Sequence, residues 1–220
     1  MMHATLSADI VSFTSLAESD RQRLREGLQG EIDALGQRYR KANFLGRLIS
    51  GDQIECALEG PESILRIGLL LKTWVKCFEP GDPPSDKKRA RYFREHGLRL
   101  AVAVAPLSTL DQRKGVIDGE AIYLSGRKIK QLSTSDKQKI IIKSTLFFCS
   151  ANADWNTRYE VIFSLLDVLL SKCSAKQSEV LHLKLRGLSE SEISKRLKKS
   201  QSTISQHSTA AGWASIEKAV

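Results

Sequence analysis

The order of strand-like and helix-like segments along residues 1–150 leaves few folds open to this chain. Each segment is recognised by its hydrophobic spacing, which alternates in a strand and recurs every three or four residues in a helix. The strand patterns cover 4–13, the two halves of 43–59, 98–106 and 137–144, and the helix patterns cover 19–41, 61–78, about 87–97 and 119–132. The helix over 19–41 contains Gly27, Gly30 and Gly36, which weaken a helix, so we expect packing to hold it.

These segments follow one another as β-α-β-β-α-β with additions, which is the wiring of a ferredoxin-like α+β sandwich. The two strands inside 43–59 are expected to form a hairpin around a two-residue turn, Gly51-Asp52. A polar stretch at 150–156 follows, and from residue 155 onward every pattern is helical. We therefore predict an α+β domain over residues 1–150 and an all-α domain over residues 151–220.

Both predicted domains are basic. The chain has 34 Lys and Arg against 25 Asp and Glu, a net charge of +9. Residues 1–150 hold 24 of these bases and 18 of the acids, and residues 151–220 hold 10 and 7. The excess of positive charge favours a polyanionic partner such as a nucleic acid. The cluster at 87–99 is expected to be a solvated helix face, with a contact to the DNA backbone as the alternative.

The sequence offers no signal for a membrane or for an oxidising compartment. It lacks a run of about 18 apolar residues and an N-terminal signal peptide, so we expect a cytoplasmic protein with no membrane partner. The four cysteines are scattered without a C-x-x-C pair, which predicts reduced thiols and no zinc site.

The most specific motif is "LSESEISKRLKKSQSTISQH" at 188–207. Gly187 is expected to end the helix before it, and Ser189 with Glu192 forms a capping box that begins the next one. Ser200 is a second N-cap only a short turn beyond that helix. Two short helices joined by a tight turn are typical of a helix-turn-helix, a DNA-binding unit.

The second of these helices has the composition that a recognition helix needs. Ile204 is expected to point inward, and its neighbours are small and polar, suited to base edges in the major groove. The residues predicted to meet bases or phosphates are Lys195, Lys198, Lys199, Ser200, Gln201, Ser202, Thr203, Ser205, Gln206 and His207. The alternative is a small helical bundle with a solvated polar face. Residues 175–210 also resemble the helix-turn-helix of sigma factors and LuxR-type regulators.

Asp9 presents a separate problem, because it lies among apolar residues in "SADIVSFT" (7–14). Burying an unpaired carboxylate costs several kcal/mol, so Asp9 needs a partner. In a sheet of the predicted order, Asp52 of the hairpin could lie beside it. Two carboxylates repel unless a divalent cation, here Mg²⁺ or Mn²⁺, bridges them, and a nucleoside triphosphate could complete its shell. Alternatively, Asp9 accepts hydrogen bonds from backbone N–H groups, and the role of Asp52 is confined to the hairpin turn.

Two segments, "ADIVSFTSL" and "ISGDQIE", resemble the metal-carboxylate motifs of class III nucleotidyl cyclases. The resemblance implies a cyclase-like sandwich with metal ligands at Asp9 and Asp52. It also implies nucleotide contacts at Phe13, Thr14 and Arg127, the last in "DGEAIYLSGRKIKQL". The sequence departs from the cyclase pattern where Tyr123 replaces an asparagine and Leu48 replaces a base-selecting lysine, so base recognition is largely lost.

The whole layout is similar to the SatD family, a degenerate cyclase-like domain that in some members carries a C-terminal helix-turn-helix with a "SQSTISQ"-like turn. The leading hypothesis is therefore a DNA-binding transcriptional regulator, acting as a homodimer, whose N-terminal domain senses a nucleotide or dimerises. We assign it no catalytic residue. The alternative is a metal-dependent nucleotidyl cyclase, or a related nucleotide enzyme, fused to a DNA-binding domain. A third hypothesis is a purely structural cyclase-like dimer module fused to a DNA-reading domain.

An apolar face is predicted on the helix that follows residue 152. Its members could belong to the core or form a dimer seam, and they are Trp155, Tyr159, Ile162, Phe163, Leu166 and Leu169.

Overall fold

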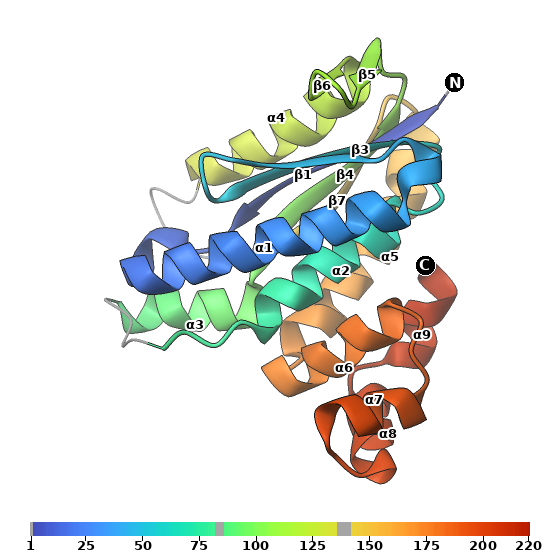
Figure 1. Cartoon of the computed structure of the whole chain (residues 1–220). Helices are drawn as coiled ribbons and strands as arrows, with labels where there is room; N and C mark the ends of the chain where they lie inside the picture. Colours follow the sequence, from blue (N-terminus) through green and yellow to red (C-terminus); the bar gives the residue numbers. More distant parts are fainter. Residues whose placement is uncertain (1, 82–85, 136–141) are drawn as a thin grey trace.

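A five-stranded sheet lies at the centre of the first two thirds of the chain (Figure 1). The computed structural model describes residues 2–81, 86–135 and 142–220. The sheet has the order β2-β3-β1-β4-β7. Its strands are β1 (His3–Ile10), β2 (Leu45–Ile49), β3 (Gln53–Glu59), β4 (Leu98–Ala105) and β7 (Leu146–Ser150).

The strand order confirms the ferredoxin-like wiring of the α+β part. β1 is central and pairs antiparallel with both β3 and β4, and β2 pairs antiparallel with β3. The crossover from β1 to β2 passes through α1 (Glu18–Arg38), and the one from β3 to β4 passes through α2 (Ile64–Cys77) and α3 (Lys87–His96). β7 is added beside β4, in parallel.

Helices α1 and α2 cover one face of the sheet (Figure 1). A Cβ on Gly27 would lie 2.7 Å from Cζ2 of Trp74, so the glycine lets α1 approach α2 closely. Gly68 of α2 likewise faces Leu6 and Leu100 of the sheet. The expectation that packing holds the glycine-containing helix is therefore confirmed at Gly27.

Helix α4 (Glu120–Ser135) covers the opposite face. Its buried Ser125 hydroxyl lies 2.8 Å from Ser7 Oγ and 3.2 Å from Thr5 Oγ1 of β1. The small side chains Ala101 and Ala103 lie beside them on β4, so α4 can rest directly on the strands. The two faces thus differ, because one is a large aliphatic core and the other is a thin layer of small and polar side chains.

Five helices follow the sheet, and the apolar core continues into the first two and into the last. They are α5 (Ala153–Lys172), α6 (Ala175–Leu185), α7 (Glu190–Leu197), α8 (Gln201–Ala210) and α9 (Trp213–Ala219). α5 packs on β7 and α6 packs on α2. Phe163 and Leu166 are buried in the same core as the sheet, whereas Trp155, Tyr159 and Ile162 are exposed. The predicted division at residue 150 stays a prediction.

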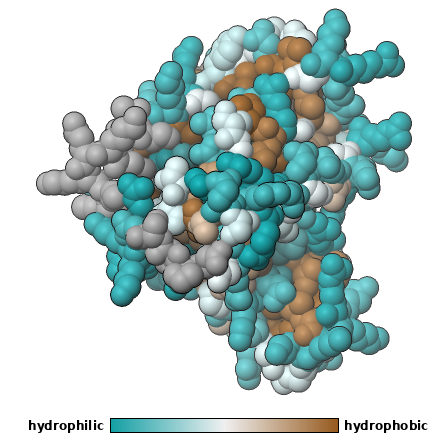
Figure 2. Space-filling view, turned by 60° about the vertical axis from the view of Figure 1, so that its left-hand side comes forward, coloured by the Kyte–Doolittle hydropathy of each residue, from teal (hydrophilic) through white to brown (hydrophobic). Residues whose placement is uncertain are grey.

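A second, small core joins α6, α7 and α8. Its members are Val180, Leu183, Ile193 and Ile204, with Leu188 and Leu197 packed against them. In the view of Figure 1 these helices form a lobe below α2. Hydrophilic side chains cover most of the face drawn in Figure 2, with brown apolar areas in its upper part and in this lower lobe.

Buried charges tie α5 to the sheet. Lys72 is fully buried, and its Nζ donates to the carbonyl oxygens of His96 and Leu98 and to Thr145 Oγ1. Asp167 of α5 accepts from the same Thr145 hydroxyl at 2.7 Å and lies 3.8 Å from the Lys72 ammonium. An ammonium and a carboxylate that share a hydrogen-bonded partner compensate each other's burial.

Three local predictions differ from the structure. The hairpin turn has three residues, Ser50 to Asp52, because Ile49 pairs with Gln53. Between the strand predicted over 98–106 and the helix predicted over 119–132, where no element was expected, the structure contains a small hairpin of β5 (Thr109–Asp111) and β6 (Val116–Asp118). The strand predicted over 137–144 falls mostly on residues 136–141, outside the described ones, and the observed strand lies later, at β7.

Short 3-10 turns occur at Phe13–Ser15 and Arg40–Ala42. In the described ranges, no helix combines the length and the apolarity that crossing a bilayer requires.

Candidate functional site

Asp9 of β1 forms an ion pair with a residue of the neighbouring strand β4. Register places Asp9 of β1 directly opposite Arg99 of β4. Arg99 Nε donates to Asp9 Oδ1 at 2.9 Å, and its second guanidinium nitrogen, Nη2, donates to Oδ2 at 2.6 Å. Arg99 is itself buried, so this bidentate pair compensates both charges where water is scarce. Arg99 was not predicted as the partner of Asp9. The position of this arginine within an apolar strand was the signal that could have identified it.

Asp52 lies at the same end of the sheet. Its backbone oxygen accepts from the N–H of Ile10, one residue beyond Asp9. Burial raises the pKa of the Asp52 carboxyl, the neighbouring Asp9 raises it further, and Arg25 of α1 opposes both. Arg25 also donates to the carbonyl oxygen of Gly51 at 3.3 Å. The structure therefore brings the two predicted carboxylates together, within a cluster that also holds two arginines.

Arginines compensate the charge of this carboxylate pair. Both Asp9 oxygens accept hydrogen bonds from Arg99, and Arg25 supplies a second positive charge beside Asp52. In the part of the chain that the structure describes, no three His, Cys, Asp or Glu side chains gather as they would around a metal. The assignment of Mg²⁺ or Mn²⁺ to Asp9 and Asp52 stays a prediction.

The predicted nucleotide contacts lie in different places. Phe13 is buried, with the Arg25 guanidinium 5.0 Å from its ring centroid, and Thr14 is exposed beside it. Arg127 lies on α4, where it lines a cavity of about 830 Å³ between α4, β7 and α5. Tyr123, one turn earlier, donates a short hydrogen bond to Asp118.

The second candidate site is the turn between α7 and α8. Ser189 and Glu192 form the predicted capping box at the start of α7, with both reciprocal hydrogen bonds present. α7 ends at Lys198, whose backbone adopts the left-handed conformation at φ 52°. Ser200 then caps α8 by accepting from the N–H of Thr203. These local features confirm the helix boundaries expected from the sequence.

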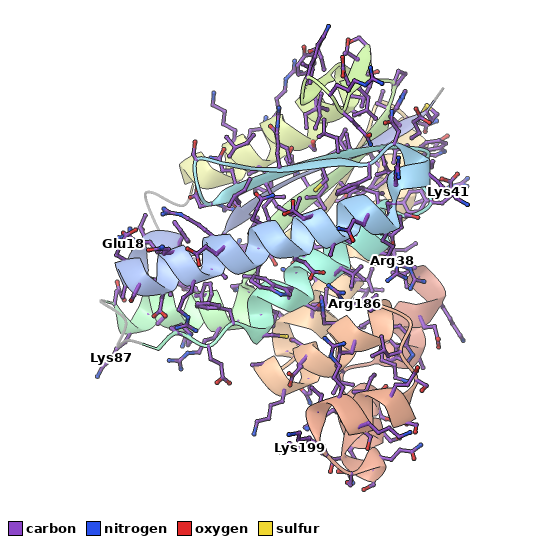
Figure 3. The ribbon with its side chains drawn as sticks, in the orientation of Figure 1. Glu18, Arg38, Lys41, Lys87, Arg186 and Lys199 are labelled. Atoms are coloured by element: carbon purple, nitrogen blue, oxygen red, sulfur yellow. The ribbon has the colours of Figure 1, made fainter. Side chains whose placement is uncertain are left out.

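Helix α8 is held by its inner side. Ile204 is fully buried in the small core and Ser208 is nearly so. The predicted DNA-contacting residues that are exposed are Lys195, Lys198, Lys199, Ser200, Gln201, Ser202 and Gln206, whereas Thr203, Ser205 and His207 are partly buried. In Figure 3, Lys199 lies on the part of the lobe away from the sheet. The arrangement leaves a polar helix face open to a large partner.

Polar contacts fix this lobe to the sheet domain at the end of α6. Arg186 donates a short hydrogen bond to buried Glu31 of α1, and Arg38 donates to the carbonyl oxygen of Arg186 at 3.1 Å (Figure 3). Burial lowers the pKa of His182 on α6 to about 4, and the positive charge of Arg186 lowers it further. Residues of α1 therefore hold the end of α6, which leads directly into α7.

Comparisons with known proteins give structural neighbours alone. No family model matches the chain, and no curated protein matches it, so the resemblance to the SatD family stays a prediction. One solved structure that the chain resembles is a bacterial light-regulated adenylyl cyclase, at 12% identity and a TM-score of 0.43, with 67% of this chain and 43% of that chain covered. The chain thus spans less than half of that cyclase's length.

Two further solved structures are also cyclases. Adenylyl cyclase CyaB from P. aeruginosa shows 12% identity and a TM-score of 0.40, covering 67% of this chain and 86% of that one. Guanylyl cyclase Cya2 shows 10% identity and a TM-score of 0.40, covering 66% of this chain and 81% of that one.

Proposed function

We propose that this protein binds DNA, with α7 and α8 as a helix-turn-helix and α8 as the helix that enters the major groove. The observation that carries the proposal is that α8 has one buried apolar side and one exposed polar side. Ile204 anchors the helix in the small core, while Gln201 and Gln206 are exposed. A recognition helix needs this combination, because it must be held rigidly and still present hydrogen-bonding side chains to base edges.

The charges around the turn support the same orientation. Lys195, Lys198 and Lys199 are exposed at the end of α7 and in the turn, immediately before the N-terminus of α8. Phosphate contacts from lysines position a protein on the duplex without reading sequence. The partial positive charge at a helix N-terminus adds to this attraction.

The α+β domain would act on the DNA-binding lobe through α6. Glu31, Arg38 and Arg66 from α1 and α2 all bond to Arg186 or Leu185 at the end of α6. A ligand that favours one arrangement of these contacts would shift the position of α8 relative to a second copy. We also propose that the protein belongs to the SatD family and regulates transcription.

Fluorescence anisotropy with labelled duplexes tests the proposal. We expect binding whose affinity falls steeply with salt. Replacing Lys198 and Lys199 with alanine should weaken all duplexes alike and reduce the salt slope by about 2, roughly one per lost phosphate contact. Lys41→Ala with Lys114→Ala is the matched control, since both lysines are exposed and lie on the sheet domain. Equal curves for the two double variants would contradict the proposal.

A nucleotidyl cyclase or a related metal-dependent nucleotide enzyme is the second candidate. The observation that favours it is the proximity of Asp9 and Asp52, with Arg25 and Arg99 close enough to attract phosphates. Pyrophosphate release from nucleoside triphosphates with Mg²⁺ or Mn²⁺ tests it. Asp52→Asn is the appropriate variant, because it leaves the Asp9–Arg99 pair intact. Identical release from the wild type and Asp52→Asn would remove this candidate.

A further inference from the structure

Helix α5 carries an apolar face that the rest of the described chain leaves exposed. Val161 is 60% exposed, Leu165 is 62% exposed and Val168 is 48% exposed. The opposite side of the same helix is buried in the main core through Phe163 and Leu166. Large aliphatic side chains gathered on one exposed helix face mark an interaction site more often than isolated ones do.

The spacing of this face is that of a coiled-coil seam. Its apolar centre is extended by a charged residue or two at each end, and the whole face consists of Asp154, Arg158, Val161, Leu165, Val168 and Lys172. The steps between them are four, three, four, three and four, which is the heptad spacing by which two helices pack side by side. The same steps are read from either end of the helix.

The chemistry of this face is also self-complementary. Asp154 lies exposed in the first turn of α5, and Lys172 lies exposed at its last residue. If a second α5 is laid antiparallel on the first, Asp154 meets Lys172 at both ends and Val161 meets Leu165 twice in the middle. Between them, the aliphatic stem of Arg158 meets Val168 on each side. A parallel arrangement would instead place Asp154 against Asp154 and Lys172 against Lys172, which is repulsive.

We propose that α5 is a homodimer interface, with the second copy packed antiparallel about a two-fold axis near residue 163. A two-fold axis requires a patch that is complementary to itself, and the α5 face meets that requirement in spacing and in charge. An unrelated partner would not need either property. This interface is independent of the α7–α8 turn, so its failure and the failure of DNA binding would be separate results.

Sedimentation equilibrium of the 220-residue chain tests the interface. The wild type should give twice the monomer mass of 24.5 kDa at high concentration. Leu165→Glu should give the monomer mass, because it places a carboxylate against the apolar centre of the second copy. Ser164→Glu is the matched control, since it adds the same charge at the preceding residue, whose side chain lies about 100° away around the helix axis. A monomeric wild type, or a dimer that survives Leu165→Glu, would overturn the proposal.

A charge exchange tests the antiparallel orientation. Asp154→Lys alone and Lys172→Asp alone each place like charges together at both ends and should weaken the dimer about tenfold, the effect of roughly 1.4 kcal/mol. The double variant restores opposite charges and should regain the wild-type dissociation constant. Thermal melts confirm that each variant is folded. A double variant as weak as the single ones would contradict the antiparallel arrangement.

Discussion

The two candidate sites of this protein differ in whether their polar groups are bonded within the protein or exposed. At the end of the sheet, Asp9 is bound by buried Arg99, so its charge is compensated inside the protein. At the α7–α8 turn, one apolar residue, Ile204, is buried, and the neighbouring lysines and glutamines are exposed. The first arrangement is what stability requires of a partly buried carboxylate, whereas the second leaves hydrogen-bonding groups available to a partner.

The largest expected effect would test whether Asp9 is structural. Asp9→Asn breaks the bidentate ion pair with the buried Arg99 guanidinium, so we expect a loss of about 3–5 kcal/mol of unfolding free energy. Urea unfolding measures it. The double variant with Arg99→Met should recover much of the loss, because neither charge then remains. An Asp9→Asn protein as stable as the wild type would mean that the pair does not compensate the two charges.

A smaller effect should appear as a loss of stability in acid, caused by His182 where α6 packs on α2. His182 has its pKa lowered from about 6.5 to about 4 in the folded protein. The unfolded chain therefore binds a proton more readily between those values, and stability falls as the pH drops through this window. A shift of this size corresponds to about 3 kcal/mol.

Urea unfolding of the wild type and His182→Gln at pH 7 and pH 4.5 measures this contribution. The variant should lose less stability on acidification, because glutamine does not titrate. Burial raises the pKa of Glu31 beside it, which acts in the opposite direction, so the comparison between the two proteins carries the test. Equal losses in both would show that His182 is not the group responsible.

The smallest effect distinguishes the two caps of the α7–α8 unit. Ser189→Ala removes the side chain that accepts from the N–H of Glu192, and Ser200→Ala removes the one that accepts from the N–H of Thr203. Each should cost about 1 kcal/mol of unfolding free energy. Only Ser200→Ala should also weaken DNA binding, because Ser200 lies at the start of α8. Equal DNA affinity in both variants would contradict that difference.

Local signals predicted much of the fold, and long-range pairing explains what they missed. The boundaries of α7 and α8 follow from Ser189, Glu192 and Ser200, which act within three residues of themselves. The Asp9–Arg99 pair spans 90 residues and depends on the register between β1 and β4, which no local pattern determines. Sequence reasoning therefore recognised that Asp9 needs a partner but did not identify Arg99, while the metal assigned to Asp9 and Asp52 stays a prediction.

Long-range contacts also explain why the position of β7 and the buried side of α5 were not predicted. β7 follows residues 142–145, which form no strand, and its parallel pairing with β4 is a long-range contact. The apolar pattern of α5 showed that the helix was amphipathic, but it could not separate buried Phe163 from exposed Ile162. That distinction depends on which side of α5 is occupied by β7 and α3.

The central claim is that α8 reads DNA sequence, and selection of duplexes from a random pool tests it most directly. The wild type should enrich a defined motif. Gln201→Ala with Gln206→Ala should relax that preference, each lost base contact costing about 1–3 kcal/mol, while retaining the salt-dependent binding that Lys198 and Lys199 support. Enrichment of the same motif by the wild type and the glutamine variant, or no motif from either, would contradict the account.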